Sequence, residues 1–126
     1  MRKARRKIAA GQIMLEKGDP EEAASDAYYA MYHAAKAMLL RRASKVTRHE
    51  DVKRKFGDLL VGTGKIEARF RDYLEAAYHG RVLADYATDP GFTVSAEDAR
   101  LYLKNAVEFV GLAEQFLKGA GGKVEQ

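Results

Sequence analysis

The segment from residue 20 to about residue 42 constrains the fold more than any other part of the chain. It follows Asp19-Pro20-Glu21-Glu22, which combines an N-cap residue, a proline at the first helical position and a glutamate at the third. The stretch AASDAYYAMYHAAKAMLL then contains no helix breaker and is apolar around most of a helical circumference. Such a helix needs neighbours on nearly all sides, and its alanines let those neighbours approach closely. The sequence therefore predicts the central helix of a helical bundle.

Four further segments have helical patterns, at residues 2–17, 47–61, 65–86 and 95–118. Thr47 and Ser95 each begin a capping box, and glycine or proline clusters separate the later segments. No segment alternates between apolar and polar residues as a half-buried strand would, so we predict no sheet. The predicted fold is all-α, an antiparallel four- to five-helix up-and-down bundle. We expect residues 1–118 to form a single domain and residues 119–126 to be a flexible tail.

Composition excludes several functional classes. The chain of 126 residues contains no cysteine, so it has neither disulfides nor thiolate metal sites. It also lacks a phosphate-binding loop, a GxGxxG motif and an HExxH motif, and the sequence predicts no metal and no cofactor. No apolar run is long enough to span a membrane, and no cleavable signal follows the basic N-terminus. We expect a cytoplasmic protein with no membrane partner.

Positive charge is concentrated in two segments. The net charge is +4, and five basic residues lie between residues 2 and 7. A second basic segment begins at Arg41 and Arg42 and extends to Lys55, where only Glu50 and Asp51 oppose it. Such clusters favour an anionic partner, nucleic acid (RNA or DNA) first. The alternative is that both clusters are solvated helix ends.

A candidate site arises from two of the predicted helices. On the central helix, spacings of three, four and three place four polar residues on one face, namely Asp26, Tyr29, His33 and Lys36. The helix over 65–86 carries Arg81 and Asp85 one turn apart, followed by Tyr86. Antiparallel packing would bring the two faces together. Arginine can grip a phosphate, histidine can act as a general base or acid, and tyrosine can stack on a base.

Each of these residues also has a purely structural interpretation. A histidine on a mostly apolar helix is more often a hydrogen-bonded core residue. Arg81 and Asp85 at i, i+4 can form an intrahelical ion pair. The tyrosines at 28, 29 and 32 can simply pack, with their hydroxyls at the surface.

The segment from Ala24 to Ala37, with the run YYAMYHAAKA, resembles the signature helix of the HEPN family, specifically of its small UPF0332 group. Two later segments agree in order with that group: residues 45–52 with Phe56, and Arg81-Val82-Leu83-Ala84-Asp85-Tyr86. The resemblance covers roughly residues 5–117.

The resemblance implies a helical homodimer that is often encoded beside a minimal nucleotidyltransferase. Many HEPN relatives are metal-independent ribonuclease toxins, whose site is an arginine followed after four to six residues by a histidine. The matching arginine here is Arg81, but Tyr86 stands where the histidine is expected. An unperturbed tyrosine is a poor base at neutral pH.

Three functional hypotheses follow. The first, which we favour, is an RNA- or nucleotide-binding HEPN subunit that acts with a minimal nucleotidyltransferase, as one member of a toxin–antitoxin pair. The second is a metal-independent endoribonuclease in which Arg81 holds the phosphate and His33 replaces the missing histidine. The third is a non-catalytic dimeric scaffold.

Overall fold

The computed structural model describes residues 1–42, 49–85 and 93–122. Its elements are α1 (Arg2–Glu16), α2 (Pro20–Arg41), α3 (His49–Phe56), the π-helical turn η1 (Gly57–Val61), α4 (Ala68–Asp85) and α5 (Ala96–Gly122). No strand occurs within the described ranges, which confirms the predicted all-α class. None of the described helices is both long enough and apolar enough to cross a lipid bilayer.

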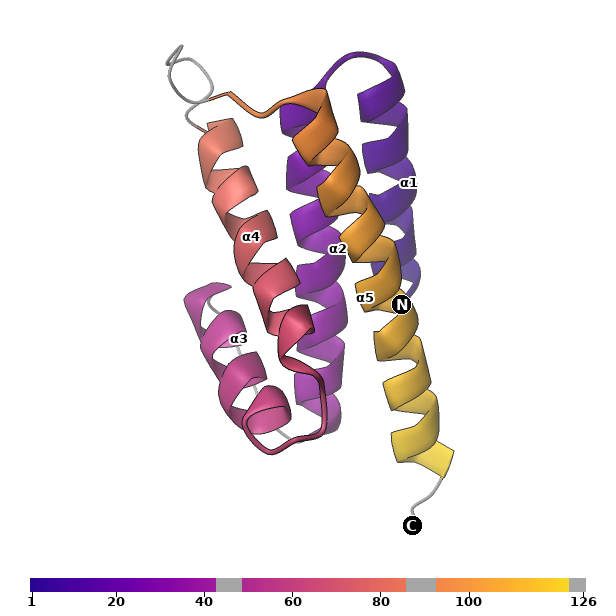
Figure 1. The fold of residues 1–126 in the computed structure, drawn as a ribbon. Helices are drawn as coiled ribbons and strands as arrows, with labels where there is room; N and C mark the ends of the chain where they lie inside the picture. Colours follow the sequence, from indigo (N-terminus) through magenta and orange to yellow (C-terminus); the bar gives the residue numbers. More distant parts are fainter. Residues whose placement is uncertain (43–48, 86–92, 123–126) are drawn as a thin grey trace.

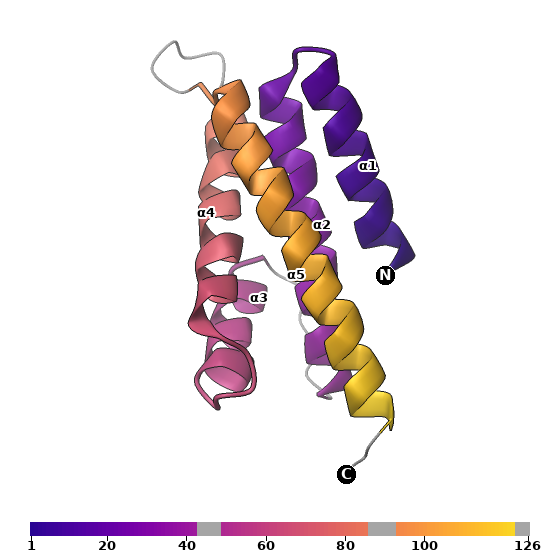
Figure 2. The same ribbon diagram turned by 45° about the vertical axis from the view of Figure 1, so that its right-hand side comes forward.

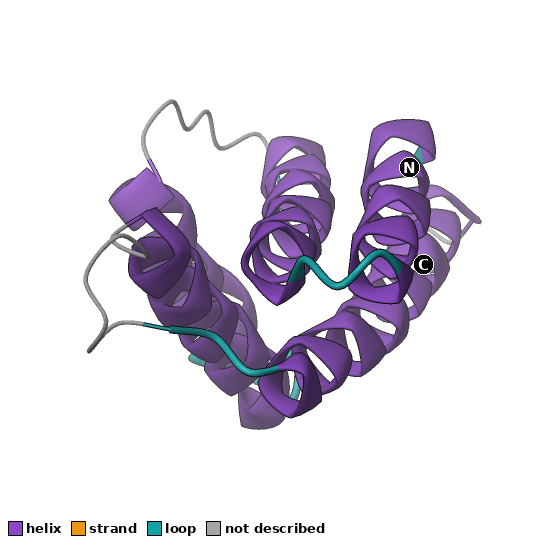
Figure 3. Ribbon diagram, turned by 90° about the horizontal axis from the view of Figure 1, so that it is seen from above, coloured by secondary structure: helices purple, strands orange, loops and turns teal. Residues whose placement is uncertain are grey.

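Helix α2 is the centre of the bundle, as its apolar circumference predicts. It packs against α1, α3, α4 and α5. Figures 1 and 2 show α2 between α1 and α4, with α5 crossing in front. The four long helices α1, α2, α4 and α5 alternate in direction along the chain, and the short α3 lies beside α4 at one end (Figure 1). Seen along the bundle in Figure 3, α1 and α4 flank α2 on two sides and α5 covers a third.

The helix starts follow the predicted capping residues. The Asp19 carboxylate accepts a hydrogen bond from the backbone N–H of Glu22 at 3.2 Å, and Pro20 is the first residue of α2. The Ser95 hydroxyl accepts one from the N–H of Asp98 at 3.0 Å. The turn from α1 to α2 contains Gly18 with φ of +83°, a conformation that side chains disfavour. The Thr47 cap lies outside the described residues.

An aromatic cluster joins the outer helices. The Phe109 ring of α5 lies 5.3 Å from the Phe56 ring of α3 and 6.1 Å from the Phe70 ring of α4, centroid to centroid, and all three side chains are buried. Two glycines permit close helix contacts: Gly11 of α1 faces α2 and α5, and Gly80 of α4 faces Tyr102 of α5. The Gly11 contact thus brings α1 close to α2 and α5, and the Gly80 contact brings α4 close to α5.

Three boundaries differ from the predictions. The third helix changes to a π-helical turn at Gly57, where Gly62 N–H bonds to the Gly57 carbonyl at 2.7 Å. Helix α4 begins at Ala68, later than the predicted Lys65, and α5 continues beyond Lys118 to Gly122. The remainder of the predicted tail, residues 123–126, lies outside the described residues.

Candidate functional site

Tyr29 is the centre of the candidate site. It lies half-buried on α2, and the Arg81 Nε of α4 donates a hydrogen bond to its hydroxyl at 2.9 Å. The Arg81 guanidinium carbon lies 5.1 Å from the centre of the Tyr29 ring, within the range of a cation–π contact. The two helices therefore bring together the arginine and the tyrosine that the sequence pattern placed on facing surfaces.

A second cation reaches the same ring from the other side of the bundle. The Lys7 Nζ of α1 lies 5.7 Å from the Tyr29 ring centre and 3.9 Å from an Asp26 carboxylate oxygen. Sequence reasoning placed Lys7 only in the N-terminal basic cluster. The contact depends on how closely α1 packs on α2, and the one local signal for that close approach is Gly11 within α1.

Asp26 lies in the interface between α1 and α2 and is only 4% exposed. Burial raises its pKa to about 6, with a further rise from the charge of Glu22 and an opposing effect from Lys7. The sequence interpretation assigned Asp26 to direct nucleotide binding, and this burial does not fit that role. The carboxylate contacts Lys7 instead.

His33 and Lys36 continue the same face of α2. The His33 ring lies 6.4 Å from the Tyr29 ring and 5.5 Å from the Tyr32 ring, and the Lys36 Nζ lies 5.6 Å from the Tyr32 ring centre. Both side chains are half-buried. They line a shallow depression of about 300 Å³, together with Met1, Lys3, Ala4, Ala37 and Leu40.

A second depression adjoins the first along α1. It has a volume of about 500 Å³ and is lined by Lys3, Arg6, Lys7, Ala9, Ala10 and Ile13. Lys3 lines both depressions, and among the described residues no acidic side chain lines either one. A cationic surface thus runs from Lys36 across α1 to Lys7, where it meets Tyr29.

Comparison with known proteins identifies the family. The family model described as HEPN domain matches residues 1–116. The chain belongs to the HEPN domain family.

Relatives with curated names agree with this assignment. The protein "Putative toxin MJ0605" of Methanocaldococcus jannaschii is 32% identical over 115 residues, which cover 91% of this chain and 84% of that protein. The "UPF0332 protein PH1297" of Pyrococcus horikoshii is 39% identical over 67 residues, 53% of this chain and 47% of that protein. The "UPF0332 protein glr0978" of Gloeobacter violaceus is 26% identical over 117 residues, 93% of this chain and 92% of that protein. The predicted resemblance to the UPF0332 group of the HEPN family is confirmed.

The remaining predicted site residues of the HEPN chain are distributed differently. Arg41 and Arg42 lie exposed at the C-terminal end of α2, about 18 Å along the helix from Tyr29 at 1.5 Å per residue. Arg41 Nη1 donates to the Leu117 carbonyl of α5 at 3.4 Å, so this side chain joins two helices. The Asp85 side chain and the whole of Tyr86 lie outside the described structure. The predicted site residues that the structure describes therefore fall into two groups. Tyr29, His33, Lys36 and Arg81 share one surface, called the Tyr29 surface below, and Arg41 and Arg42 form a distant pair.

A larger cavity that sequence reasoning missed lies between α3, η1 and α4. Its volume is about 560 Å³, and its lining includes Lys53, Arg54, Gly57, Asp58, Gly62, Arg71, Leu74 and Glu75. Arg54 is paired with Asp51 at 3.4 Å and with Asp58 at 3.7 Å. Among the described residues, the two carboxylates of Asp58 and Glu75 line this cavity beside its three cations, so it attracts a phosphate less strongly than depressions that no acidic side chain lines.

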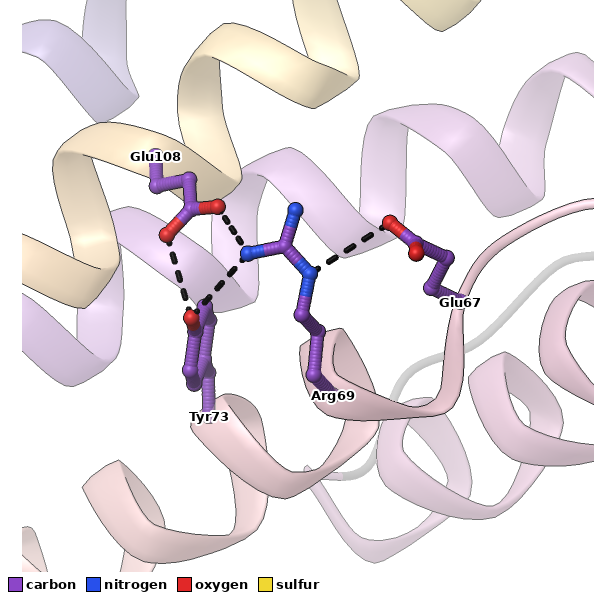
Figure 4. A network of polar contacts seen from close by, with 4 residues as sticks. All are labelled: Glu67, Arg69, Tyr73 and Glu108. Carbon is purple, nitrogen blue, oxygen red and sulfur yellow. Dashed lines mark hydrogen bonds and ion pairs between the residues drawn. The ribbon is translucent and has the colours of Figure 1, made fainter.

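Another arginine of the HEPN chain is held in a polar network between α4 and α5 (Figure 4). Arg69 Nη1 donates to the Tyr73 hydroxyl at 3.2 Å and also to Glu108, while Arg69 Nε contacts Glu67 at 3.3 Å. Tyr73 donates to Glu108 at 3.0 Å. The hydrogen bond from Arg69 lowers the pKa of Glu108. Two carboxylates thus neutralise this guanidinium, which links helices.

The described part of the chain contains no cluster of side chains that could bind a metal ion. Within residues 1–42, 49–85 and 93–122, no three histidine, aspartate or glutamate side chains are grouped as metal ligands would be.

Proposed function

We propose that this HEPN chain is the RNA- or nucleotide-binding subunit of a cytoplasmic toxin–antitoxin pair, in which a minimal nucleotidyltransferase is its partner. The observation that carries the proposal is the Tyr29 ring, contacted by Arg81 from α4 and by Lys7 from α1. Two relatives named as putative toxins support the toxin role, the proteins MJ0605 and MJ0142 of Methanocaldococcus jannaschii. The resemblance to the HEPN family supports the partner and a homodimer.

The chemistry of this surface fits a phosphate attached to a base. Arginine binds two phosphate oxygens with one planar group, and lysine adds a point charge. A tyrosine ring offers a face on which any base can stack, and the half-buried Tyr29 is held edge to face against the buried Tyr32, with ring centroids 6.2 Å apart. The lysines that line the two adjoining depressions would extend the contact along an RNA strand.

Salt-dependent RNA binding tests the proposal. We expect a labelled single-stranded RNA to bind the purified protein, and the affinity to fall steeply as salt rises, because bound cations release counterions from the phosphates. Arg81→Ala should weaken binding about tenfold or more, as the loss of a charge-assisted contact does. It should also lower the salt slope by about 0.7 for one phosphate.

Arg100→Ala is the matched control, since Arg100 is an exposed arginine on α5. It removes the same charge at another surface and should leave the affinity and the slope unchanged. If Arg81→Ala binds RNA as the unmodified protein does, or if Arg100→Ala weakens binding equally, the Tyr29 surface is not the binding site.

The toxin role has its own test. Induced expression of the chain in a bacterial host should arrest growth, and Arg81→Ala should relieve the arrest while Arg100→Ala should not. Co-expression of the cognate nucleotidyltransferase should restore growth and yield a complex that co-purifies. Normal growth with the soluble unmodified chain would exclude a toxin role in that host.

A metal-independent ribonuclease is the second candidate, because His33 and Arg81 both contact the Tyr29 ring. Imidazole is a common general base near neutral pH, and a guanidinium stabilises charge on phosphate. RNA incubated with the protein and a chelator should then be cleaved, and His33→Gln should abolish cleavage while RNA binding persists. If RNA binds but is not cleaved, the ribonuclease hypothesis is excluded and the hypothesis of a binding subunit is retained. Absence of both binding and cleavage would favour the scaffold.

A further inference from the structure

Asp26 is the one buried charged residue in the described part of the chain, and it lies beside the candidate site without facing it. An isolated carboxylate in an apolar interface is strongly unfavourable, so such a group persists where it has a partner and a use. The charges of Glu22 on α2 and of the N-cap residue Asp19 further disfavour the ionised form of Asp26, because both are negative. The favourable contact is with Lys7, whose Nζ lies 3.9 Å from the Asp26 carboxylate.

The packing around Asp26 fixes this contact. A Cβ at Gly11 of α1 would lie 3.2 Å from the Asp26 Cβ, so the absence of a side chain at Gly11 lets α1 approach α2 at that point. Lys7 is four residues before Gly11, one turn away on the same face of α1. The close approach therefore brings the Lys7 chain over α2 at the level of Asp26 and Tyr29.

Lys7 is itself partly solvated, with a side chain 41% exposed, whereas the Asp26 side chain is 6% exposed. An exposed lysine on a helix samples many rotamers, and holding it in one place costs side-chain entropy. A rigid buried carboxylate can supply that restraint. The Lys7 ammonium then stays 5.7 Å from the centre of the Tyr29 ring, which Arg81 contacts from α4.

We infer that Asp26 is a positioning residue, whose buried carboxylate holds the Lys7 ammonium at the Tyr29 ring, so that Lys7 and Arg81 place two cations at that ring for the phosphates of a bound RNA. The inference rests on the proposed function, and it replaces a direct contact between Asp26 and the ligand with an indirect one. Lys7 and Arg81 contact phosphates of the bound RNA, and Asp26 acts through Lys7.

The effect of Asp26→Asn on RNA binding has a sign that distinguishes this role from simple electrostatics. Removing a negative charge near a phosphate site should tighten anion binding if Asp26 only repels the ligand. If Asp26 positions Lys7, Asp26→Asn should instead weaken binding of a labelled single-stranded RNA by several-fold. Lys7→Ala should weaken it about tenfold, as loss of one charged contact does, and lower the salt slope by about 0.7.

A double-mutant cycle separates positioning from two independent effects. Lys7→Ala in the Asp26→Asn background should weaken binding less than it does in the unmodified protein, because Lys7 is already misplaced there. Lys7→Arg should retain most of the affinity. Glu22→Gln is the matched control, since Glu22 is an exposed acid one turn before Asp26 on α2. It should leave binding unchanged or slightly tighter.

Stability measured on the same proteins tests whether Asp26 has a merely structural role. Asparagine has nearly the shape of aspartate and carries no buried charge, so Asp26→Asn should unfold at an equal or higher temperature while it binds RNA less well. A structural role would lower stability and affinity together. Tighter RNA binding by Asp26→Asn, or additive effects in the cycle, would overturn the inference. If neither Asp26→Asn nor Arg81→Ala weakens RNA binding, both the inference and the proposed function fail. If Arg81→Ala weakens binding and Asp26→Asn does not, the inference fails and the proposed function stands.

Discussion

The same substitution, glycine to alanine, should have opposite effects at two helical positions of this chain. Gly80 lies within α4 and Gly111 within α5. A Cβ at Gly80 would lie 2.6 Å from Tyr102 Cε2, 3.0 Å from Cζ and 3.2 Å from Cδ2, all on one aromatic ring. A Cβ at Gly111 would meet nothing within 4 Å. The helix propensity gained is equal at both sites, so the difference isolates the contact with Tyr102.

The magnitudes follow from these distances. Alanine in a helix interior is more favourable than glycine by about 0.5–1 kcal/mol, and Gly111→Ala should stabilise the fold by that amount. Ordinary carbon contacts begin near 3.5 Å, so at Gly80 the ring or the backbone must move by almost 1 Å. Overpacking of this kind destabilises by about 1–3 kcal/mol. Gly80→Ala should therefore lose about 0.5–2 kcal/mol after the propensity gain.

Urea unfolding at equilibrium measures both values from one fitted slope. Thermal unfolding should place the Gly80→Ala midpoint roughly 5–12 °C below that of Gly111→Ala. Replacing Tyr102 with leucine in the Gly80→Ala background should recover part of the loss, because the clashing ring is then absent. If Gly80→Ala is as stable as Gly111→Ala, the close contact of α4 with α5 is not the constraint described above.

Two further predictions concern charged groups. The pKa of Asp26 is raised from an ordinary 3.8 to about 6, so the folded protein binds a proton more tightly than the unfolded chain does. The free energy of unfolding should therefore fall as pH rises from about 4 to about 6, by roughly 3 kcal/mol at most. Asp26→Asn should remove this fall in urea unfolding measured across that pH range. A flat profile in the unmodified protein would contradict the burial of a charged Asp26. Arg69→Ala should lower the midpoint of thermal unfolding slightly in low salt and not at all near 1 M salt, because its partners Glu67 and Glu108 are exposed and screened there. A loss that persists in high salt would instead point to packing by the arginine stem.

Local signals predicted the helices of this fold, because caps and breakers act within a few residues. Asp19 and Ser95 cap α2 and α5 as expected, and the apolar circumference of α2 placed it at the centre of the bundle. The π-helical turn η1 was not predicted. It is defined by which carbonyl accepts the hydrogen bond from the Gly62 N–H, and the periodicity of apolar residues does not indicate that acceptor.

The candidate site was predictable only in part. The spacing on α2 and α4, with antiparallel packing, was enough to bring Tyr29 and Arg81 together. The contribution of Lys7 and the burial of Asp26 depend on the separation of α1 and α2, which Gly11 sets through a tertiary contact. A glycine inside an amphipathic helix was the available signal, since it often marks a close approach.

The number of basic residues in a segment says little about binding until their partners are known. In the N-terminal cluster, Arg5 pairs with Glu114 of α5, whereas Lys7 lies at a tyrosine ring on α2 and has the buried carboxylate of Asp26 beside it. In the second cluster, Arg54 pairs with Asp51 and Asp58. A carboxylate beside a cation cancels much of its long-range field, whereas an aromatic ring carries no net charge and does not. Lys53, in the second cluster, also lies against a tyrosine, 4.1 Å from the centre of the Tyr78 ring, but Asp58 and Glu75 line the same cavity beside η1. A cation at a tyrosine ring therefore favours a binding face only where no acidic side chain lines the adjoining depression, and among the described residues that condition selects the α2 surface.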